Sequence, residues 1–199
     1  DKLLAKTLMA GAGIMVPPTL ALTEDSHVYP KDSPGAHVIK PRNDGSSFGV
    51  VIVPESQTRP PARSVWPANS QLICEPYIPG RELTVAVLDG IALCVTEITS
   101  ERKFYDFEAK YAIGGSTHIL PAQIPEAINL KASLWAEQAY RQHGCPGIIR
   151  ADYRWDDKSD QLFMLEVNTQ PGMTASSLVP EQARFVGMSG EELVNHLLE

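Results

Sequence analysis

Charged and amide side chains gather late in the chain on two apolar stretches, residues 147–155 (GIIRADYRW) and 161–168 (QLFMLEVN). The polar run DDKSD between them predicts a turn, so we expect the two stretches to pair as an antiparallel hairpin. With the turn centred on Ser159, residues equally distant from it face each other across the strands. Because side chains alternate between the two faces of a strand, the facing polar residues should share one face.

This register places Asp152 opposite Glu166 and Arg150 opposite Asn168. Two carboxylates and an amide oxygen are hard ligands of the kind that Mg²⁺ accepts, usually together with water and substrate phosphates. The alternative is a solvated strand face with an ordinary salt bridge. The apolar residues that flank Glu166 favour a buried setting, in which carboxylates would be costly without a metal ion. The hairpin therefore predicts a magnesium site beside an arginine.

A second candidate site is the segment 39–49 (IKPRNDGSSFG), which joins two expected strands. Its backbone N–H groups and the hydroxyls of Ser46 and Ser47 could contact phosphate oxygens, while Lys40 adds a positive charge. The alternative is an ordinary β-turn with a surface lysine. The segment also matches the G-x-S-x-G pattern of serine hydrolases around Ser47. That pattern needs a helix after the serine, whereas the following VVIV predicts a strand.

Two further segments have the composition of ligand-binding loops. Residues 104–111 (FYDFEAKY) combine aromatic and basic side chains and precede a Gly-Gly-Ser sequence, which is typical of a lid. The alternative is a loop that its aromatic residues merely pin down. Residues 168–178 (NTQPGMTASSL) place Gly172 after a proline and before small polar residues, a composition that permits close approach of a ligand to the backbone.

Helices and strands must position these segments. Helical spacing is found in residues 2–10, in residues 125–143 and after the capping box of Ser189 and Glu192. In the second helix, the stripe expected to face the core contains Ala127, Leu130 and Leu134.

Strands are expected around Val38 and Ile39, over residues 50–53 and in a hairpin with its turn at Asp89-Gly90. Helices mixed with antiparallel strand pairs predict an α+β chain with two lobes and a boundary near residues 75–95.

Composition excludes several classes of protein. The 199 residues include 24 acidic and 17 basic side chains, for a formal net charge of −7, and no basic run is present. This balance argues against a nucleic-acid-binding protein. No apolar run approaches the roughly 18 to 20 residues that cross a bilayer. Because Cys74, Cys94 and Cys145 form no disulfide or metal-binding pattern, we expect reduced, buried thiols in a soluble cytoplasmic protein.

In chain order, the segments DKLLAK, IKPRNDGSSFGV, EPYIPGRE, FYDFEAKY, GCPGIIRADY, LEVNTQPGMTASSLVP and GMSGEEL closely resemble those of D-alanine–D-alanine ligases of the ATP-grasp superfamily. The resemblance implies an α+β ATP-grasp fold in which two lobes, residues 1–75 and 76–199, enclose a nucleotide between antiparallel sheets. It also implies that the N-terminal substrate domain of the family is absent here, with the glutamate that holds the first D-alanine. The family often has a lysine after the position of Glu75, where this chain has Pro76.

The resemblance further implies a role for each candidate residue. Two Mg²⁺ or Mn²⁺ ions would be bound by Asp152, Glu166 and Asn168. ATP would be held by Lys2, Lys40, Ser47, Glu75, Tyr77, Ile78, Glu82, Phe104, Lys110 and Leu165. An oxyanion hole would be formed by Arg150 and Gly172. The carboxylate of the second D-alanine would be received by Ser177 and Leu178, and Tyr111 would link to Ser46 to hold the lid shut.

The activity implied by the resemblance is ATP-dependent ligation of two D-alanines through an acyl phosphate, for peptidoglycan synthesis. It also implies a homodimer for the full-length protein, and a monovalent cation is a further candidate cofactor. One alternative is another ATP-grasp carboxylate–amine ligase, for example a D-alanine–D-lactate ligase. Because those ligases lack the lid pair Lys110-Tyr111, the pair favours the dipeptide product. The other alternative is a nucleotide-binding module without ligase activity.

Overall fold

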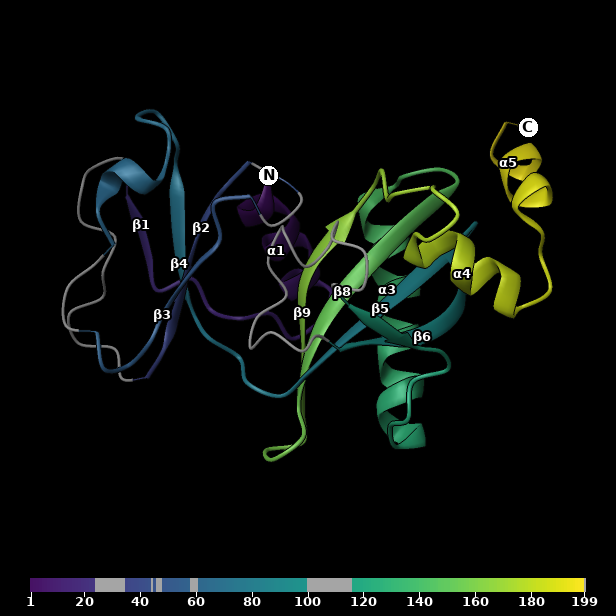
Figure 1. Cartoon of the computed structure of the whole chain (residues 1–199), viewed down its shortest axis with the longest axis horizontal. Helices are drawn as coiled ribbons and strands as arrows, with labels where there is room; N and C mark the ends of the chain where they lie inside the picture. Colours follow the sequence, from purple (N-terminus) through teal and green to yellow (C-terminus); the bar gives the residue numbers. More distant parts are fainter. Residues whose placement is uncertain (24–34, 44, 46–47, 58–60, 100–115, 199) are drawn as a thin grey trace.

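The computed structural model describes residues 1–23, 35–43, 45, 48–57, 61–99 and 116–198. In these residues, two antiparallel β-sheets lie side by side along the long axis of the molecule (Figure 1). Helices pack on both faces of the larger sheet. The arrangement confirms the α+β class expected from the sequence.

The smaller sheet has four strands in the order β1-β4-β2-β3. Their bounds are Ala21–Thr23 for β1, His37–Pro41 for β2, Val51–Val53 for β3 and Leu72–Pro76 for β4. One face of this sheet packs on Trp66, whose Nε1 donates to the Gly49 carbonyl at 2.6 Å. A short 3₁₀ helix, η1 (Arg63–Val65), precedes Trp66, in keeping with the prolines around it.

The larger sheet has five strands in the order β7-β6-β5-β8-β9. Their bounds are Arg81–Leu88 for β5, Ile91–Thr99 for β6, Thr117–Ile119 for β7, Ile148–Asp156 for β8 and Gln161–Asn168 for β9. The turn predicted at Asp89-Gly90 joins β5 to β6. Both residues have positive φ, 47° and 84°, which a tight two-residue hairpin turn of this kind requires.

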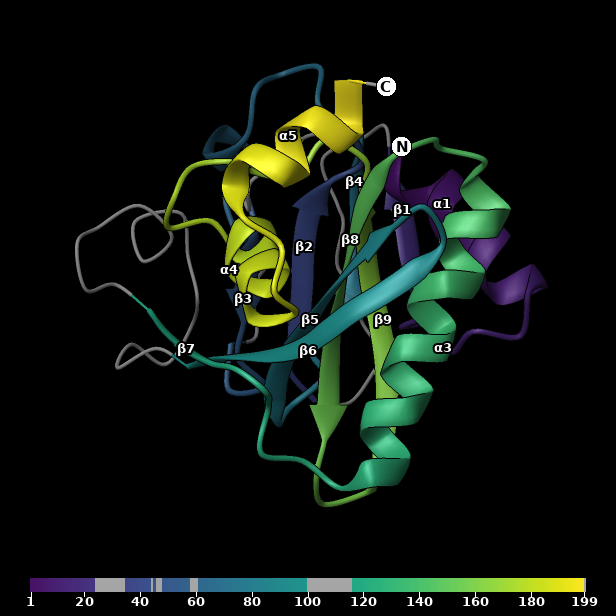
Figure 2. The ribbon, with the colours of Figure 1, turned by 90° about the vertical axis from the view of Figure 1, so that its right-hand side faces the viewer.

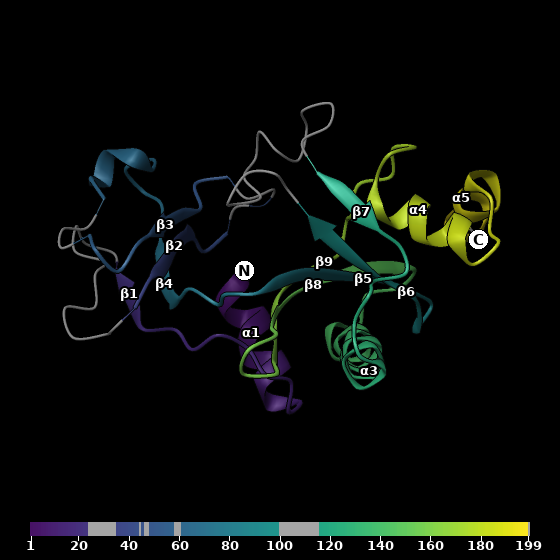
Figure 3. The same cartoon turned by 60° about the horizontal axis from the view of Figure 1, so that its bottom comes forward.

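Helices cover both faces of the larger sheet (Figures 2 and 3). One face carries α1 (Lys2–Gly11) and α3 (Glu126–His143), and the other carries α4 (Leu178–Phe185) and α5 (Gly190–Leu198). Alternate residues of β5 face the two layers: Val85 packs in the core under α1 and α3, and Ala86 in the core under α4 and α5. The larger sheet therefore forms the central layer of this part of the molecule.

The buried stripe of α3 differs from the prediction, although the helix itself is confirmed. Leu130 and Leu134 are 55% and 59% exposed, and Ala127 is also exposed. The fully or nearly buried side chains are those of Ile128, Ala132, Ala136 and Ala139. Small alanines let the helix approach the sheet closely. The prediction chose the face with the leucines because leucine is the more hydrophobic residue, and that face is exposed.

The end of the chain is helical in two places. The predicted capping box is confirmed: Ser189 Oγ accepts from the Glu192 N–H at 3.1 Å, and Glu192 Oε2 accepts from the Ser189 N–H at 2.7 Å. The helix α4 was not expected, because the small polar residues before it suggested only a loop. No helix of the described residues is long and apolar enough to span a membrane.

All three cysteines are free thiols, as expected. Cys74 is buried, but Cys94 and Cys145 are half-buried, which corrects the expectation that all three are buried. Burial raises the pKa of the Cys74 thiol to about 11, and the neighbouring Glu75 charge adds to the shift. Cys74 is therefore a protonated core residue at neutral pH, not a nucleophile.

Candidate active site

The β8–β9 hairpin brings the predicted polar residues together on one face of the larger sheet. Arg150 pairs with Asn168 and Asp152 pairs with Glu166, as predicted. The turn is nevertheless centred between residues 158 and 159, since Asp156 pairs with Gln161. A bulge before Glu166 restores the register by adding one residue to β9.

The Asp152 carboxylate is the centre of this polar face. Its Oδ1 accepts hydrogen bonds from Thr84 Oγ1 at 2.7 Å and Arg150 Nε at 2.8 Å. Its Oδ2 accepts from Arg150 Nη2 and Asn168 Nδ2, both at 2.8 Å. Only 9% of Asp152 is exposed, so the two-bond pair with the Arg150 guanidinium compensates a largely buried negative charge.

Asp152, Glu166 and Asn168 supply the hard oxygen ligands that Mg²⁺ requires. Asn168 donates its side-chain Nδ2 to Asp152, so the side-chain Oδ1 of Asn168 is the atom that could bind a cation. Glu166 adds a half-buried carboxylate directly across from Asp152. In the described part of the chain, this site included, no group of three His, Cys, Asp or Glu side chains could hold a metal ion, so the site depends on the Asn168 amide for its third ligand. The donor set is thus two carboxylates and one amide, with an arginine beside them.

A buried cluster of three charges lies between the smaller sheet and α1. Glu75 on β4 contacts the ammonium of Lys40 on β2 at 2.8 Å and also that of Lys6 on α1. The exposed fractions of these residues are 2%, 7% and 4%. With two ammonium groups and one carboxylate, the cluster carries one excess positive charge when all three groups are ionised, which favours an anion nearby.

Lys6 was not among the residues that the sequence indicated. Its Nζ also donates to Thr19 Oγ1 at 3.1 Å. Burial lowers the pKa of the Lys6 ammonium, and the charge of Glu75 opposes that shift. Lys6 lies four residues after Lys2 on the same helix, so helical spacing was the signal that could have linked the two lysines.

The start of α1 lies beside the end of β2. The N–H of Lys2 donates to the Arg42 carbonyl at 3.0 Å, and Arg42 Nε donates to the carboxylate of the N-cap residue Asp1 at 2.8 Å. Asp1 also caps the helix by accepting from the Leu3 and Leu4 N–H groups. These contacts bring the chain at Lys2 close to the strand that carries Lys40.

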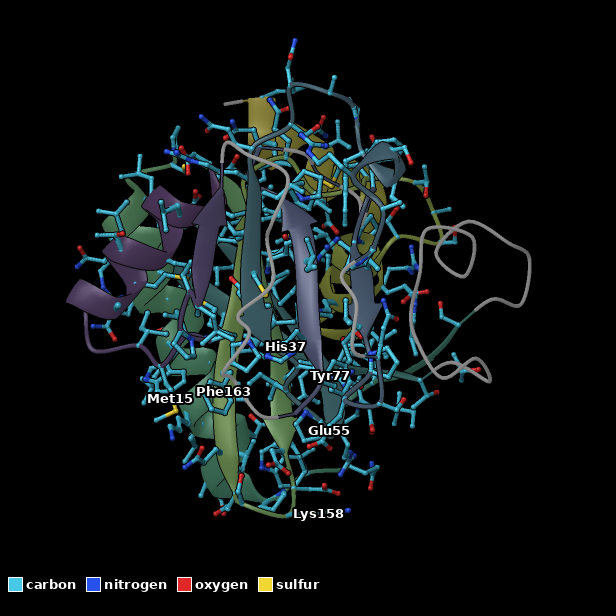
Figure 4. The ribbon with its side chains drawn as sticks, turned by 90° about the vertical axis from the view of Figure 1, so that its left-hand side faces the viewer. Met15, His37, Glu55, Tyr77, Lys158 and Phe163 are labelled. Atoms are coloured by element: carbon cyan, nitrogen blue, oxygen red, sulfur yellow. The ribbon has the colours of Figure 1, made fainter. Side chains whose placement is uncertain are left out.

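Tyr77 and Ile78, predicted to contact the nucleotide, lie on the connection between the sheets, and Glu82 lies at the start of β5. Tyr77 lies next to His37, the first residue of β2 (Figure 4). Arg154 on β8 bonds both the hydroxyl of Tyr77 and the carbonyl of Ile78, and it lies 3.6 Å from Glu82. Because Arg154 is two residues from Asp152 on the same strand, the connection lies over the same face as the carboxylates.

Gly172 and Ser177 meet where the chain enters α4. The Thr174 N–H donates to Ser177 Oγ at 3.1 Å, and a Cβ added at Gly172 would lie 3.0 Å from that oxygen. Ser177 is the N-cap of α4, and Leu178, its first residue, is buried. The positive end of the helix dipole is therefore directed to this corner.

The remaining candidates stay predictions. Leu165 is half-buried and lies in β9 next to Glu166. The other candidates lie outside the described residues: Ser46, Ser47, Phe104, Lys110 and Tyr111.

The two antiparallel sheets, with a carboxylate-bearing face on one and a buried charge cluster between the other and α1, have the architecture of an ATP-grasp protein. A family model described as the D-ala D-ala ligase C-terminus matches residues 8–199. The chain belongs to this family.

Relatives and solved structures agree with this assignment. The chain is 48% identical over 204 residues to a D-alanine–D-alanine ligase of Paramagnetospirillum magneticum, covering all of this chain and 66% of that protein. It is 45% identical over 206 residues to the corresponding ligase of Caulobacter sp., covering 64% of that protein. The chain thus spans slightly less than two thirds of the length of these relatives.

Among solved structures, a D-alanine–D-alanine ligase from Bacillus anthracis in complex with ATP superposes with a TM-score of 0.79 at 23% identity. The match covers all of this chain and 64% of that one, and at this identity it shows the fold alone. The VanG D-Ala:D-Ser ligase from Enterococcus faecalis superposes with a TM-score of 0.78 at 27% identity and is covered over 60% of its length.

Proposed function

We propose that this chain is the nucleotide-binding and ligating part of a D-alanine–D-alanine ligase that supplies peptidoglycan precursors in the bacterial cytoplasm. The observation that carries the proposal is the buried Asp152 carboxylate, held by Arg150 and Asn168 on one sheet face beside the connection that contains Tyr77 and Ile78. The 48% identity to a ligase of that name supports it. The activity is proposed for the protein that contains this chain.

ATP would bind between the two sheets, with its phosphates at the lysines. Lys2 and Lys40 supply positive charge, and the excess charge of the Lys6–Glu75–Lys40 cluster adds to it. Adenine and ribose would lie along the connection after Glu75, whose carboxylate is already engaged by the lysines. Tyr77 and Ile78 on this connection and Glu82 at the start of β5 are proposed to line the adenine and ribose region, with Phe104 and Leu165 against the base. Lys110 is proposed to contact the γ-phosphate, with Ser47 in the loop over the nucleotide.

Asp152, Glu166 and Asn168 are proposed to hold Mg²⁺, in two ions by family analogy. When bound, Mg²⁺ would neutralise the negative charge of the phosphates during transfer. The Asn168 Oδ1 and the Glu166 carboxylate are the donors that the Asp152 network leaves open. The Arg150 guanidinium balances the negative charge of the Asp152 carboxylate.

The ligation needs two steps on the substrates. The carboxylate of the first D-alanine attacks the γ-phosphorus of ATP, which releases ADP and leaves an acyl phosphate. The amine of the second D-alanine then attacks the acyl carbon, and the tetrahedral intermediate expels phosphate. Arg150 and the Gly172 N–H are proposed to stabilise its oxyanion. Ser177 and Leu178, at the start of α4, are proposed to hold the second carboxylate. Tyr111 is proposed to close the lid onto Ser46.

The test is ADP release from MgATP by the full-length protein that contains this chain. Separate reactions would contain D-alanine alone, D-alanine with D-lactate, D-alanine with D-serine, and L-alanine alone. We expect release to require D-alanine and the product to be D-alanyl-D-alanine. A faster mixed reaction with D-serine or D-lactate would assign a different acceptor and overturn the dipeptide assignment.

D-serine is included because the VanG D-Ala:D-Ser ligase shares the fold at a TM-score of 0.78. Tight MgATP binding without release in any of these reactions would instead favour a nucleotide-binding module. A homodimer is proposed for the full-length protein by family analogy, and its mass by light scattering would test it.

A further inference from the structure

The connection between the two sheets passes against one arginine side chain. β4 ends at Pro76 and β5 begins at Arg81, so residues 77–80 carry the chain from one sheet to the other. Arg154 on β8 donates from Nε to the Ile78 carbonyl at 3.1 Å and from Nη2 to the Tyr77 hydroxyl at 3.0 Å. Its guanidinium carbon also lies 5.5 Å from the centroid of the Tyr77 ring.

The connection is fixed on either side of these contacts. At its start, the Tyr77 N–H donates to the Ala36 carbonyl at 2.8 Å. At its end, Gly80 has a φ of +96° and passes so close to β8 that a Cβ would lie 2.1 Å from the Trp155 carbonyl oxygen. Arg154 acts between these two points, where its rigid planar group can hold a carbonyl and a ring together.

Arg154 also reaches the first residues of β5. It pairs with Glu82 across β8 and β5, and its Nη1 lies 3.6 Å from a Glu82 carboxylate oxygen. Both side chains are about four-fifths buried, with exposed fractions of 18% and 22%, so solvent screens the attraction only in part. Arg154 thus contacts Tyr77, Ile78 and Glu82 at once.

We propose that Arg154 is a positioning residue for the adenosine part of the nucleotide. It holds the ring of Tyr77, the carbonyl of Ile78 and the carboxylate of Glu82 in the arrangement that receives adenine and ribose, and it fixes them to the strand of Asp152. The inference rests on the proposed function, because that function assigns these three residues to the nucleotide. The phosphates are held elsewhere, by Lys2 and Lys40, so the effect of Arg154 is confined to adenosine.

The test compares two ligands of the full-length protein that contains this chain, MgATP and magnesium tripolyphosphate, by calorimetric titration. Arg154→Met keeps an unbranched, flexible side chain, although a shorter one, and removes every donor. We expect its Kd for MgATP to rise by about tenfold or more and its Kd for tripolyphosphate to stay unchanged. An equal loss for both ligands would indicate general damage to the fold, and no loss for either would also overturn the inference.

Matched variants keep the result interpretable. Arg141→Met makes the same change at an exposed position of α3, on the other side of the sheet, and should leave both Kd values unchanged. Tyr77→Phe removes only the hydroxyl that Arg154 bonds, and it should give a smaller loss that is again selective for MgATP. If Arg154→Met does not fold, Tyr77→Phe decides the question, and an unchanged MgATP Kd overturns the inference.

Amide hydrogen exchange separates this inference from the proposed function. Arg154→Met should speed exchange of the Tyr77 N–H, which closes the connection onto Ala36, relative to wild type and to Arg141→Met. Unchanged exchange would overturn the role of Arg154 whatever the chain binds. Faster exchange in a chain that binds no MgATP would uphold the contact but reject the proposed function, and with it the assignment to adenosine.

Discussion

The Gln182 side chain accepts a hydrogen bond from the backbone N–H of Ala86, opposite a bulge in β6. The register between β5 and β6 shifts between Val85 and Val87, and the Ala86 N–H donates to Gln182 Oε1 at 2.8 Å. Gln182 Nε2 donates in turn to the Thr84 carbonyl at 3.3 Å, and the side chain has no exposed surface. Because Thr84 also bonds Asp152, this glutamine fixes α4 to the strand that supports the polar site.

Replacing Gln182 tests that anchor. Gln182→Met has a similar shape without the amide, so it leaves the buried Ala86 N–H without its acceptor and should lower the free energy of unfolding by about 1–3 kcal/mol. Gln182→Glu keeps an acceptor oxygen and should cost less at a pH where the carboxyl is protonated. Urea unfolding at neutral and acidic pH measures both variants. Equal stability of wild type and Gln182→Met would contradict the role of the amide.

Glu166→Gln tests the metal site. The substitution removes one of the two proposed carboxylate ligands while leaving the Asp152 hydrogen bonds in place. The Mg²⁺ concentration for half-maximal ATP binding should rise by about tenfold or more. Calorimetric titration of Mg²⁺ at a fixed ATP concentration measures it. Glu191→Gln, at an exposed position of α5, is the charge-matched control. The metal assignment fails if the two variants respond to Mg²⁺ alike.

Gly80→Ala tests the tight passage of the inter-sheet connection along β8. A methyl group at this position meets the Trp155 carbonyl in a backbone conformation that L-residues rarely adopt. We expect the free energy of unfolding to fall by more than about 2 kcal/mol. Gly11→Ala is the matched control, because nothing lies within 4 Å of its added methyl group. It should change stability by less than about 1 kcal/mol, and a similar loss in both variants would contradict the close passage.

Tyr153→Phe tests a buried phenol and its pH dependence. Tyr153 donates to the Ala132 carbonyl at 2.8 Å, and burial, with the nearby Asp152 charge, raises the pKa of the phenol well above its ordinary value. The unfolded chain ionises this group near pH 10, so above that pH the unfolded state releases a proton that the folded state keeps. The stability that the neutral phenol contributes is therefore complete below about pH 10 and declines as the pH rises further.

Tyr153→Phe should accordingly cost about 1 kcal/mol near pH 8, because the Ala132 carbonyl loses its donor. Above about pH 10 the difference between wild type and variant should shrink or reverse. Urea unfolding at the two pH values gives the difference, and absorbance near 295 nm follows ionisation of the phenol. A difference that stays constant with pH would contradict the raised pKa.

Local patterns predicted the elements well where the residues themselves dictate the structure. The Asp89-Gly90 turn needs two positive φ angles that these residues tolerate, and the box of Ser189 and Glu192 bonds its own backbone. The pairing of Asp152 with Glu166 was also predicted, but it is reached by a shifted turn and a bulge. The shifted turn and the bulge each change the register by one residue, in opposite directions, so their effects cancel. Counting residues along the sequence could not distinguish this hairpin from a regular one.

The α+β class, the main strands and helices, and the resemblance that pointed to the polar residues of β8 and β9 all followed from the amino-acid sequence. They did so because turn geometry, helix capping and strand alternation depend on neighbouring residues. The side chains that support the site became visible only in the folded chain, where Lys6 contacts Glu75, Arg154 bonds Ile78 and Gln182 bonds Ala86. Each pair joins residues more than 60 positions apart, and their contacts depend on how sheets and helices pack. The same holds for α3, where close packing on the sheet selected alanines over the more hydrophobic leucines.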